Sequence, residues 1–262
     1  MTKRLHRPAT LVLGGACLSA ATAALVGIAG AQSDQGTSAQ NGSSAQAAGA
    51  QAAGKTIRLE EATMIIELNS TDRDAGIQVF LDGEPWKSMK IMRPGGRKLV
   101  KVKAKGRLKG FGLTELFSES NEPEFSELPL RKFKRRFPEG KYTFVGRTIE
   151  GHKLRGTAKF THHIPKGPKI TSPTEGAEVP ADDVVASWDP VRDTRRVDIV
   201  GYRAIVEKEK PLRVFSADLP ANVTSIPIPR EFLQAGKKHK LEVQAIERGG
   251  NQTISEIEFR VE

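Results

Sequence analysis

The stretch Val185-Ala186-Ser187-Trp188-Asp189-Pro190 is a short apolar run that ends in a turn containing proline. Similar runs follow it along the chain, and they are broken by Gly, Pro, Asn and Asp. Short runs bounded by such turn residues are typical of β-strands. Residues 166–262 are therefore predicted to form a β-sandwich with strands at Val184–Trp188, Val200–Val206, Leu212–Ala217, Thr224–Ile228, Lys240–Ile246 and Ile254–Val261.

Several residues of this segment follow the order found in fibronectin type III domains. They are Trp188 just before a Pro-containing turn, Tyr202 on the third strand, Leu233 and Gly236, then Leu241, Val243 and Ala245, and finally Gly249-Gly250-Asn251 and Ser255. The segment resembles that family over essentially its whole length, which implies a sandwich fold with a spacer or interaction role. The family usually has a Tyr three residues after the Gly, where its hydroxyl ties down a corner. This chain has His239 there, and it has no Arg-Gly-Asp triplet.

Residues 55–165 repeat the pattern of short apolar runs, so we expect a second sandwich there. Its expected strands are Thr63–Leu68, Ile77–Leu81, Trp86–Met92, Leu99–Ala104, Lys141–Ile149 and Lys153–His162. Asp82-Gly83 is expected to be a turn, Glu150-Gly151 a hairpin turn, and Gly110–Pro129 a long loop with a helical turn. The run Gly140-Lys141-Tyr142-Thr143-Phe144 loosely resembles immunoglobulin-like sandwiches of secreted bacterial proteins. The chain is thus expected to be all-β, with an immunoglobulin-like domain at 55–165 and a fibronectin type III-like domain at 166–262.

The N-terminal residues predict export. Residues 1–31 have the basic, apolar and small-residue regions of a secretory signal peptide, and the last three are Ala29-Gly30-Ala31. Residues 32–54 contain no large apolar residue and almost no charge, so we expect a disordered linker. The expected location is secreted, periplasmic or cell-surface. Two alternatives stay open, namely an uncleaved membrane anchor and lipidation at Cys17, the only cysteine.

Basic charge is concentrated in residues 55–165, which hold 23 Lys and Arg against 14 Asp and Glu, while the whole chain carries +10. Lys101, Lys103 and Lys105 alternate with apolar residues, so a strand would place all three on one solvent face. A second cluster follows in residues 131–137. The candidate polyanion-binding residues are Arg97, Lys98, Lys101, Lys103, Lys105, Arg107, Lys109, Arg131, Lys132, Lys134, Arg135 and Arg136.

A second interpretation of this charge is a solvated surface that protects a sheet edge and is neutralised within the chain. The acids that would neutralise it lie between the two basic clusters, at Glu115, Glu119, Glu122, Glu124 and Glu127. If the basic surface does bind, its expected partner is an acidic polysaccharide, a wall polymer or an anionic protein. Specific nucleic-acid recognition is not expected, and membrane contact is expected only if the N-terminal segment is uncleaved or lipidated. We expect a monomer.

One short motif suits a cation. Asp72-Arg73-Asp74-Ala75-Gly76 places oxygen ligands at alternate positions before a glycine, as a calcium loop does, so Asp72 and Asp74 are candidate ligands. A third acid is missing, and the position that a calcium loop fills with Glu is Gly83. Asp-rich turns between strands are also common for conformational reasons alone. No other cofactor is expected, because the adjacent His162 and His163 would point to opposite faces of a strand.

The sequence carries none of the common catalytic motifs. The chain has no Gly-x-Ser-x-Gly elbow, phosphate-binding loop, dinucleotide fingerprint or His-Glu-x-x-His sequence. The chain is therefore predicted to be a non-catalytic binding or spacer protein that uses its basic face. Two alternatives are an adaptor that binds another protein along a sheet edge, and an uncharacterised hydrolase with its site in residues 110–129.

Overall fold

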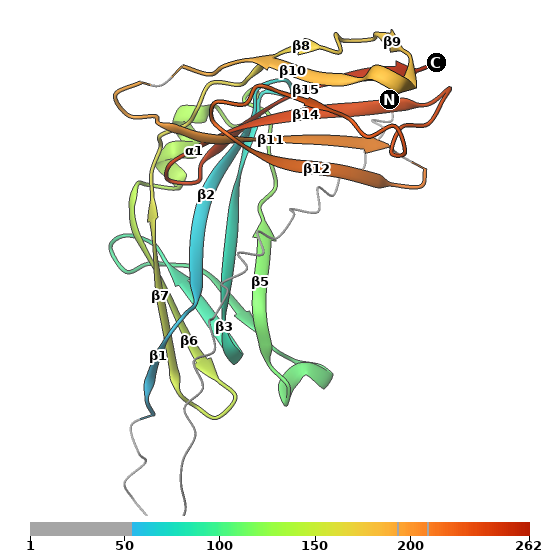
Figure 1. Cartoon of the computed structure of the whole chain (residues 1–262). Coiled ribbons are helices and arrows are strands. Elements are labelled where there is room, and N and C mark those ends of the chain that lie inside the picture. The colour runs from blue at the N-terminus through green and yellow to red at the C-terminus, as the bar shows by residue number, and fades with distance from the viewer. Residues whose placement is uncertain (1–53, 193, 209) are drawn as a thin grey trace, which may run out of the picture. The chain divides into compact units, whose positions relative to one another are not determined.

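The computed structural model describes residues 54–192, 194–208 and 210–262, which belong to one compact unit (Figure 1). The predicted signal peptide at 1–31 and, apart from Gly54, the predicted linker at 32–54 lie outside the described residues. In the part of the chain that is described, no helix is long and apolar enough to span a bilayer. The boundary between the two predicted domains, at residues 165 and 166, stays a prediction.

The described residues contain fifteen strands and three short helical segments. This confirms the all-β prediction. The strands of the N-terminal half are β1 (Thr56–Arg58), β2 (Glu61–Asn69), β3 (Asp74–Met92), β4 (Lys98–Lys103), β5 (Leu113–Glu119), β6 (Gly140–Thr148) and β7 (Lys153–Phe160). Those of the C-terminal half are β8 (Lys169–Ser172), β9 (Glu178–Val179), β10 (Val185–Asp189), β11 (Ile199–Lys208), β12 (Arg213–Pro220), β13 (Ser225–Pro227), β14 (Lys238–Glu247) and β15 (Gln252–Val261). The helical segments are η1 (Gly106–Lys109), α1 (Leu130–Arg136) and η2 (Ala181–Asp183).

The long strand β3 organises the first sandwich. Up to Asp82 it lies between β2 and β5, and from Trp86 onward it lies between β6 and β4. The prediction of two strands separated by a turn at Asp82-Gly83 is therefore wrong, because the chain bends there without reversing. Pairing is irregular on both sides of Trp86, and a Cβ on Gly83 would lie 2.8 Å from the Leu59 side chain. Gly83 thus serves close packing of the bent strand rather than a hairpin.

The segment Gly110–Pro129 was predicted as a long loop, and this prediction is wrong in part, because β5 runs through it. Leu113 and Leu116 of β5 are half-buried against the first hydrophobic core, and antiparallel pairing with β3 fixes the strand. Among the described strands, β5 pairs only with β3, at the edge of the sheet, so most of its residues are polar and most are exposed. Its sequence therefore lacks the apolar run by which a strand is predicted. The predicted hairpin at Glu150-Gly151 is confirmed, since β6 and β7 pair antiparallel and Gly151 has φ +98°.

The second sandwich packs a three-stranded sheet, β13-β10-β8, against the strands β15-β14-β11-β12. Trp188 of β10 and Tyr202 of β11 meet in its core with ring centroids 5.5 Å apart. These are the two aromatic residues on which the sequence resemblance rests. The cores of the two halves are separate clusters, but β15 also pairs in parallel with β2, where Gln252 lies opposite Glu67. A group of carboxyl side chains lies beside that junction.

Candidate functional site

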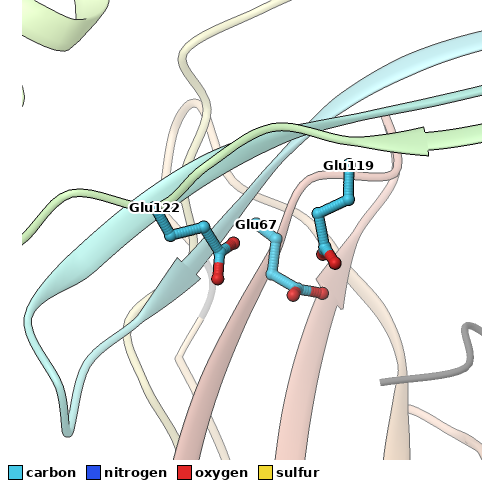
Figure 2. Close-up of side chains that lie close together, drawn as sticks. All are labelled: Glu67, Glu119 and Glu122. Atoms are coloured by element: carbon cyan, nitrogen blue, oxygen red, sulfur yellow. The ribbon is translucent and has the colours of Figure 1, made fainter. Parts of the chain in front are cut away.

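Three carboxyl groups from separate segments gather beside the β2–β15 junction. Glu67 lies on β2, Glu119 ends β5, and Glu122 follows β5 (Figure 2). Each side chain offers an oxygen, and these oxygens all lie within 4.8 Å of one another. They meet because β3 pairs with β2 on one edge and with β5 on the other.

Amide side chains, rather than cations, contact this carboxyl cluster. Gln252 Nε2 donates a hydrogen bond to Glu67 Oε2 across the parallel pair, and Gln78 Nε2 donates to Glu119 Oε1 at 2.9 Å. Among the residues that the structure describes, no Lys, Arg or His forms an ion pair with any of the three glutamates. The negative charge of the cluster is therefore balanced by protons or by an outside cation.

The surroundings favour protons on these groups. Burial, and then the nearby Glu119 charge, raise the pKa of Glu67 to about 7. Burial, followed by the charges of Glu67 and Glu119, raises the pKa of Glu122 to about 8. Because the Glu67 charge contributes to the shift of Glu122, these two carboxyl groups titrate as a coupled pair. The cluster thus holds protons near neutral pH.

The predicted cation ligands Asp72 and Asp74 lie beside this cluster but outside the set of three. The Oδ1 of Asn69 accepts the backbone N–H groups of Thr71, at 2.9 Å, and Asp72, at 3.1 Å, which closes the turn. Burial and the Asp72 charge raise the pKa of Asp74 to about 6. Calcium takes six to eight oxygen ligands, so a calcium site would have to draw on water or backbone as well. Calcium binding stays a prediction.

Sequence reasoning missed the group formed by Glu67, Glu119 and Glu122. Glu67 follows the apolar run of β2, and no local pattern links it to the other two. The only signal is a charged residue inside an apolar strand, which identifies an unusual position but not its partners.

Lys98, Lys101 and Lys103 of β4 are exposed, as predicted. The neighbouring strand β3 places a fourth exposed lysine, Lys90, beside them. Lys101 lies opposite Lys90 of β3 in the antiparallel pair. Repulsion from Lys103, with smaller contributions from slight burial and from Lys90 and Lys98, lowers the pKa of Lys101. We call Lys90, Lys98, Lys101 and Lys103 the β4 surface. Its like charges crowd one another, and none of the four lysines forms an ion pair among the residues that the structure describes.

The predicted alternation along β4 is only partly correct. Val102 is half-buried and Ala104 is buried, as expected, but Val100 is exposed. The pairing of β3 with β4 is irregular between Ile91 and Met92, close to this end of β4. Lys105, Arg107 and Lys109 lie beyond the strand, in and around η1.

The second predicted basic cluster forms α1. Phe133 is buried and anchors the helix, while Arg131, Lys132, Arg135 and Arg136 are exposed. Three of the helix cations line an open cavity of about 490 Å³, whose lining is Leu130, Arg131, Lys134, Arg135 and His162. His162 Nε2 is 2.8 Å from the carbonyl oxygen of Phe137, which holds the ring in place.

The two basic clusters approach each other at one end only. Figure 1 shows α1 well apart from the short green coil of η1 below β5. Only the beginning of the first cluster approaches the helix, where Arg93 Nη1 is 3.5 Å from the Arg136 carbonyl oxygen. The cations of the first cluster therefore begin near α1, at Arg97, and end far from it, in and around η1.

None of the glutamates between the clusters forms an ion pair with a basic residue in the part of the chain that is described. All nine ion pairs among the described residues join positions from Lys169 to Arg260, in the second sandwich. Glu119 and Glu122 lie in the carboxyl cluster instead. Within the part of the chain that is described, the basic residues of the first sandwich thus form no ion pair.

No protein-family model and no curated protein matches this chain. Among solved structures it is similar to a segment of two fibronectin type III domains from chicken tenascin, with 12% identity, a TM-score of 0.26, and 76% of this chain and 96% of that chain covered. It is also similar to the FN1–FN3 domains of chicken CNTN1, with 9% identity, a TM-score of 0.29, and 79% of this chain and 66% of that chain covered. At TM-scores this low, the fold assignment rests on the strand order and core contacts described above.

Proposed function

We propose that the protein is an exported, non-catalytic binding module whose first sandwich contacts an acidic polymer. The observation that supports this most directly is that the basic residues of the first sandwich form no ion pairs in the described part of the chain. Ion pairs are confined to the second sandwich among the described residues, and like charges crowd Lys101. A polyanion would relieve this repulsion and would be attracted from a distance.

The α1 cavity would receive individual acidic groups. Arg131, Lys134 and Arg135 are spaced three and four residues apart, so they share one helix face and converge on the cavity. A guanidinium offers paired N–H donors that match a carboxylate, sulfate or phosphate group. The β4 surface would attract a neighbouring stretch of the same polymer, because exposed lysines act as point charges.

The second sandwich would serve as a spacer. Its ion pairs are internally matched, as in Arg203 with Asp218 and Arg248 with Asp198. It therefore contributes little field of its own. A polymer held by the first sandwich would be displayed at a defined distance from whatever the second sandwich contacts.

The test is binding of residues 32–262, the chain expected after signal cleavage, to a carboxylated or sulfated polysaccharide and to a neutral one. Two charge-reversed variants would be compared, Lys101→Glu/Lys103→Glu and Arg131→Glu/Lys134→Glu. The matched control is Arg195→Glu/Arg213→Glu, which changes the net charge equally on exposed residues of the second sandwich.

We expect binding to the acidic polymer alone, weakening with salt because screening shortens the range of these charges. Each variant of the first sandwich should bind at least about tenfold more weakly, which corresponds to about 1.4 kcal/mol, and the control should bind like the parent protein. Equal losses in all three variants would show a net-charge effect without a site. Absence of binding by the parent protein would leave the sheet-edge adaptor as the better hypothesis.

A further inference from the structure

The segment between β4 and β5 protrudes from the sheet. Ala104 N–H donates to the Lys87 carbonyl at 3.0 Å, and Leu113 lies opposite Trp86. Residues 105–112 therefore leave and rejoin the edge of β3 at adjacent positions. We call these eight residues the η1 loop.

The η1 loop has a defined conformation. The backbone N–H groups of Phe111 and Gly112 both donate to the Leu108 carbonyl, at 3.2 and 2.9 Å. Gly106 and Gly112 adopt φ values of +56° and +79°, which are unfavourable for other residues. The loop is thus shaped by its own hydrogen bonds, without packing its large apolar side chains into the core.

Two large apolar side chains cap this protrusion. Phe111 is 82% exposed and Leu108 is 50% exposed, the highest values among the large hydrophobic residues described as exposed. Phe117 on β5 and Val100 on β4, the strands that flank the loop, are also exposed. Exposed apolar groups that lie together and are bordered by polar residues are typical of protein or membrane interaction sites.

Cations alternate with these apolar residues. Lys105, Arg107 and Lys109 lie in the same loop, and the sequence has no acid from Arg93 until Glu115. None of the three cations forms an ion pair in the described part of the chain. The loop therefore combines an apolar tip with uncompensated positive charge.

We propose that the η1 loop docks on an anionic lipid surface. Phe111 and Leu108 would enter the boundary between headgroups and acyl chains, while Lys105, Arg107 and Lys109 would contact lipid phosphates. This partner fits because it offers an apolar phase and negative charge at the same depth. A water-soluble polyanion offers only the charge. The inference goes beyond the proposed function, because it requires the apolar tip and needs no contact by the N-terminal segment.

The first experiment is co-sedimentation of residues 32–262 with vesicles of phosphatidylcholine alone or mixed with phosphatidylglycerol. Leu108→Ser/Phe111→Ser removes the apolar tip and leaves every charge in place. Leu212→Ser/Val214→Ser is the matched control, because it removes exposed apolar side chains from the edge region of the second sandwich. Binding of each protein to the acidic polysaccharide is measured in parallel.

We expect the parent protein and the control to sediment with the anionic vesicles only. The tip variant should lose at least about tenfold in vesicle affinity, because the lost apolar burial is substantial, and should keep its affinity for the polysaccharide. Undiminished vesicle binding by the tip variant would overturn the lipid proposal. So would polysaccharide binding by the parent protein without any vesicle binding, a result that leaves the proposed function intact.

A second measurement reads insertion directly. In a Phe111→Trp variant, the new indole should be quenched by lipids brominated on their acyl chains, whereas the buried Trp86 and Trp188 should not be. Quenching equal to that of the parent protein would contradict insertion of the tip, even if the vesicles bind. Circular dichroism of each variant confirms that the fold is retained.

Discussion

Asn251 Oδ1 accepts the backbone N–H of Ile66 at 2.8 Å, across 185 positions of sequence. The same side chain donates from Nδ2 to the carbonyl oxygens of Thr161 and His163, at 3.2 and 3.0 Å. Asn251 is only 2% exposed, so these bonds form away from water. One amide thus joins β2, the segment after β7 and the turn between β14 and β15.

Replacement of Asn251 by Ala should destabilise the protein by about 2–4 kcal/mol, because several buried backbone groups lose their partner at once. Urea unfolding followed by tryptophan fluorescence would measure this change. The matched control, Asn222→Ala, alters an exposed turn residue and should have little effect. A loss of similar size in both variants would contradict the assigned role of Asn251.

The carboxyl cluster should make stability fall as the pH rises. The pKa of Glu67 is about 7 in the folded protein against a usual value of 4.5, so the folded state retains a proton that the unfolded state has released. The stability that this retained proton contributes is fully present below pH 4.5, and it is lost as the pH rises through about 7. It amounts to as much as about 3 kcal/mol.

Glu67→Gln mimics the protonated acid and should flatten this dependence between pH 4.5 and about 7, the usual and the folded pKa of Glu67. Unfolding free energies at a series of pH values would show it. The control is Glu115→Gln on exposed positions of β5. An unchanged slope in Glu67→Gln would show that Glu67 is already ionised in the folded state.

His239 should limit stability on the acidic side. Burial lowers its pKa below 6.5, so the folded state holds a neutral ring that the unfolded chain can protonate. Its contribution is present above pH 6.5 and is lost as the pH falls through the lower folded value. His239→Phe would keep the aromatic contact with Phe259, whose centroid is 5.4 Å away. The variant should therefore unfold at lower pH than the parent, and acid titration by circular dichroism tests this.

The hydrogen bond from the Tyr142 hydroxyl in the first sandwich should contribute about 1 kcal/mol to the free energy of unfolding. The Tyr142 hydroxyl donates to the Pro138 carbonyl at 3.1 Å, and Gly140 between them has φ +137°. Tyr142→Phe removes only that bond from a fully buried ring. Urea denaturation should give a lower midpoint with an unchanged slope. A variant as stable as the parent would show that the hydroxyl is satisfied equally well in the unfolded chain.

Local patterns were sufficient to predict much of the fold. Trp188 and Tyr202 marked the second sandwich correctly, because each lies in a short apolar run flanked by turn residues. His239 stands where the family usually has a tyrosine. Its Nδ1 lies 3.2 Å from the Lys237 carbonyl oxygen, so the ring contacts the backbone only two residues earlier in the sequence.

Long-range pairing explains what was missed. β3 has a Gly-containing stretch that looks like a turn, and only its partners on both edges keep it extended. The carboxyl cluster requires Glu67, Glu119 and Glu122 to be brought together by that same strand. Lys90 joined the β4 surface through a register that no single segment encodes.

The parallel pairing of β2 with β15 also has a consequence for the order of assembly. Residues Glu67–Asn69 find their partners at Gln252–Ile254, almost at the far end of the sequence. Because the ribosome makes β2 long before β15, that edge of the first sandwich stays open during most of synthesis and closes last. An exposed strand edge invites pairing with other chains. Pulse-labelled hydrogen exchange during refolding should accordingly find the amides of Ile66 and Ser70, which donate to Asn251 Oδ1 and to the Ile254 carbonyl, protected later than those that pair β6 with β7.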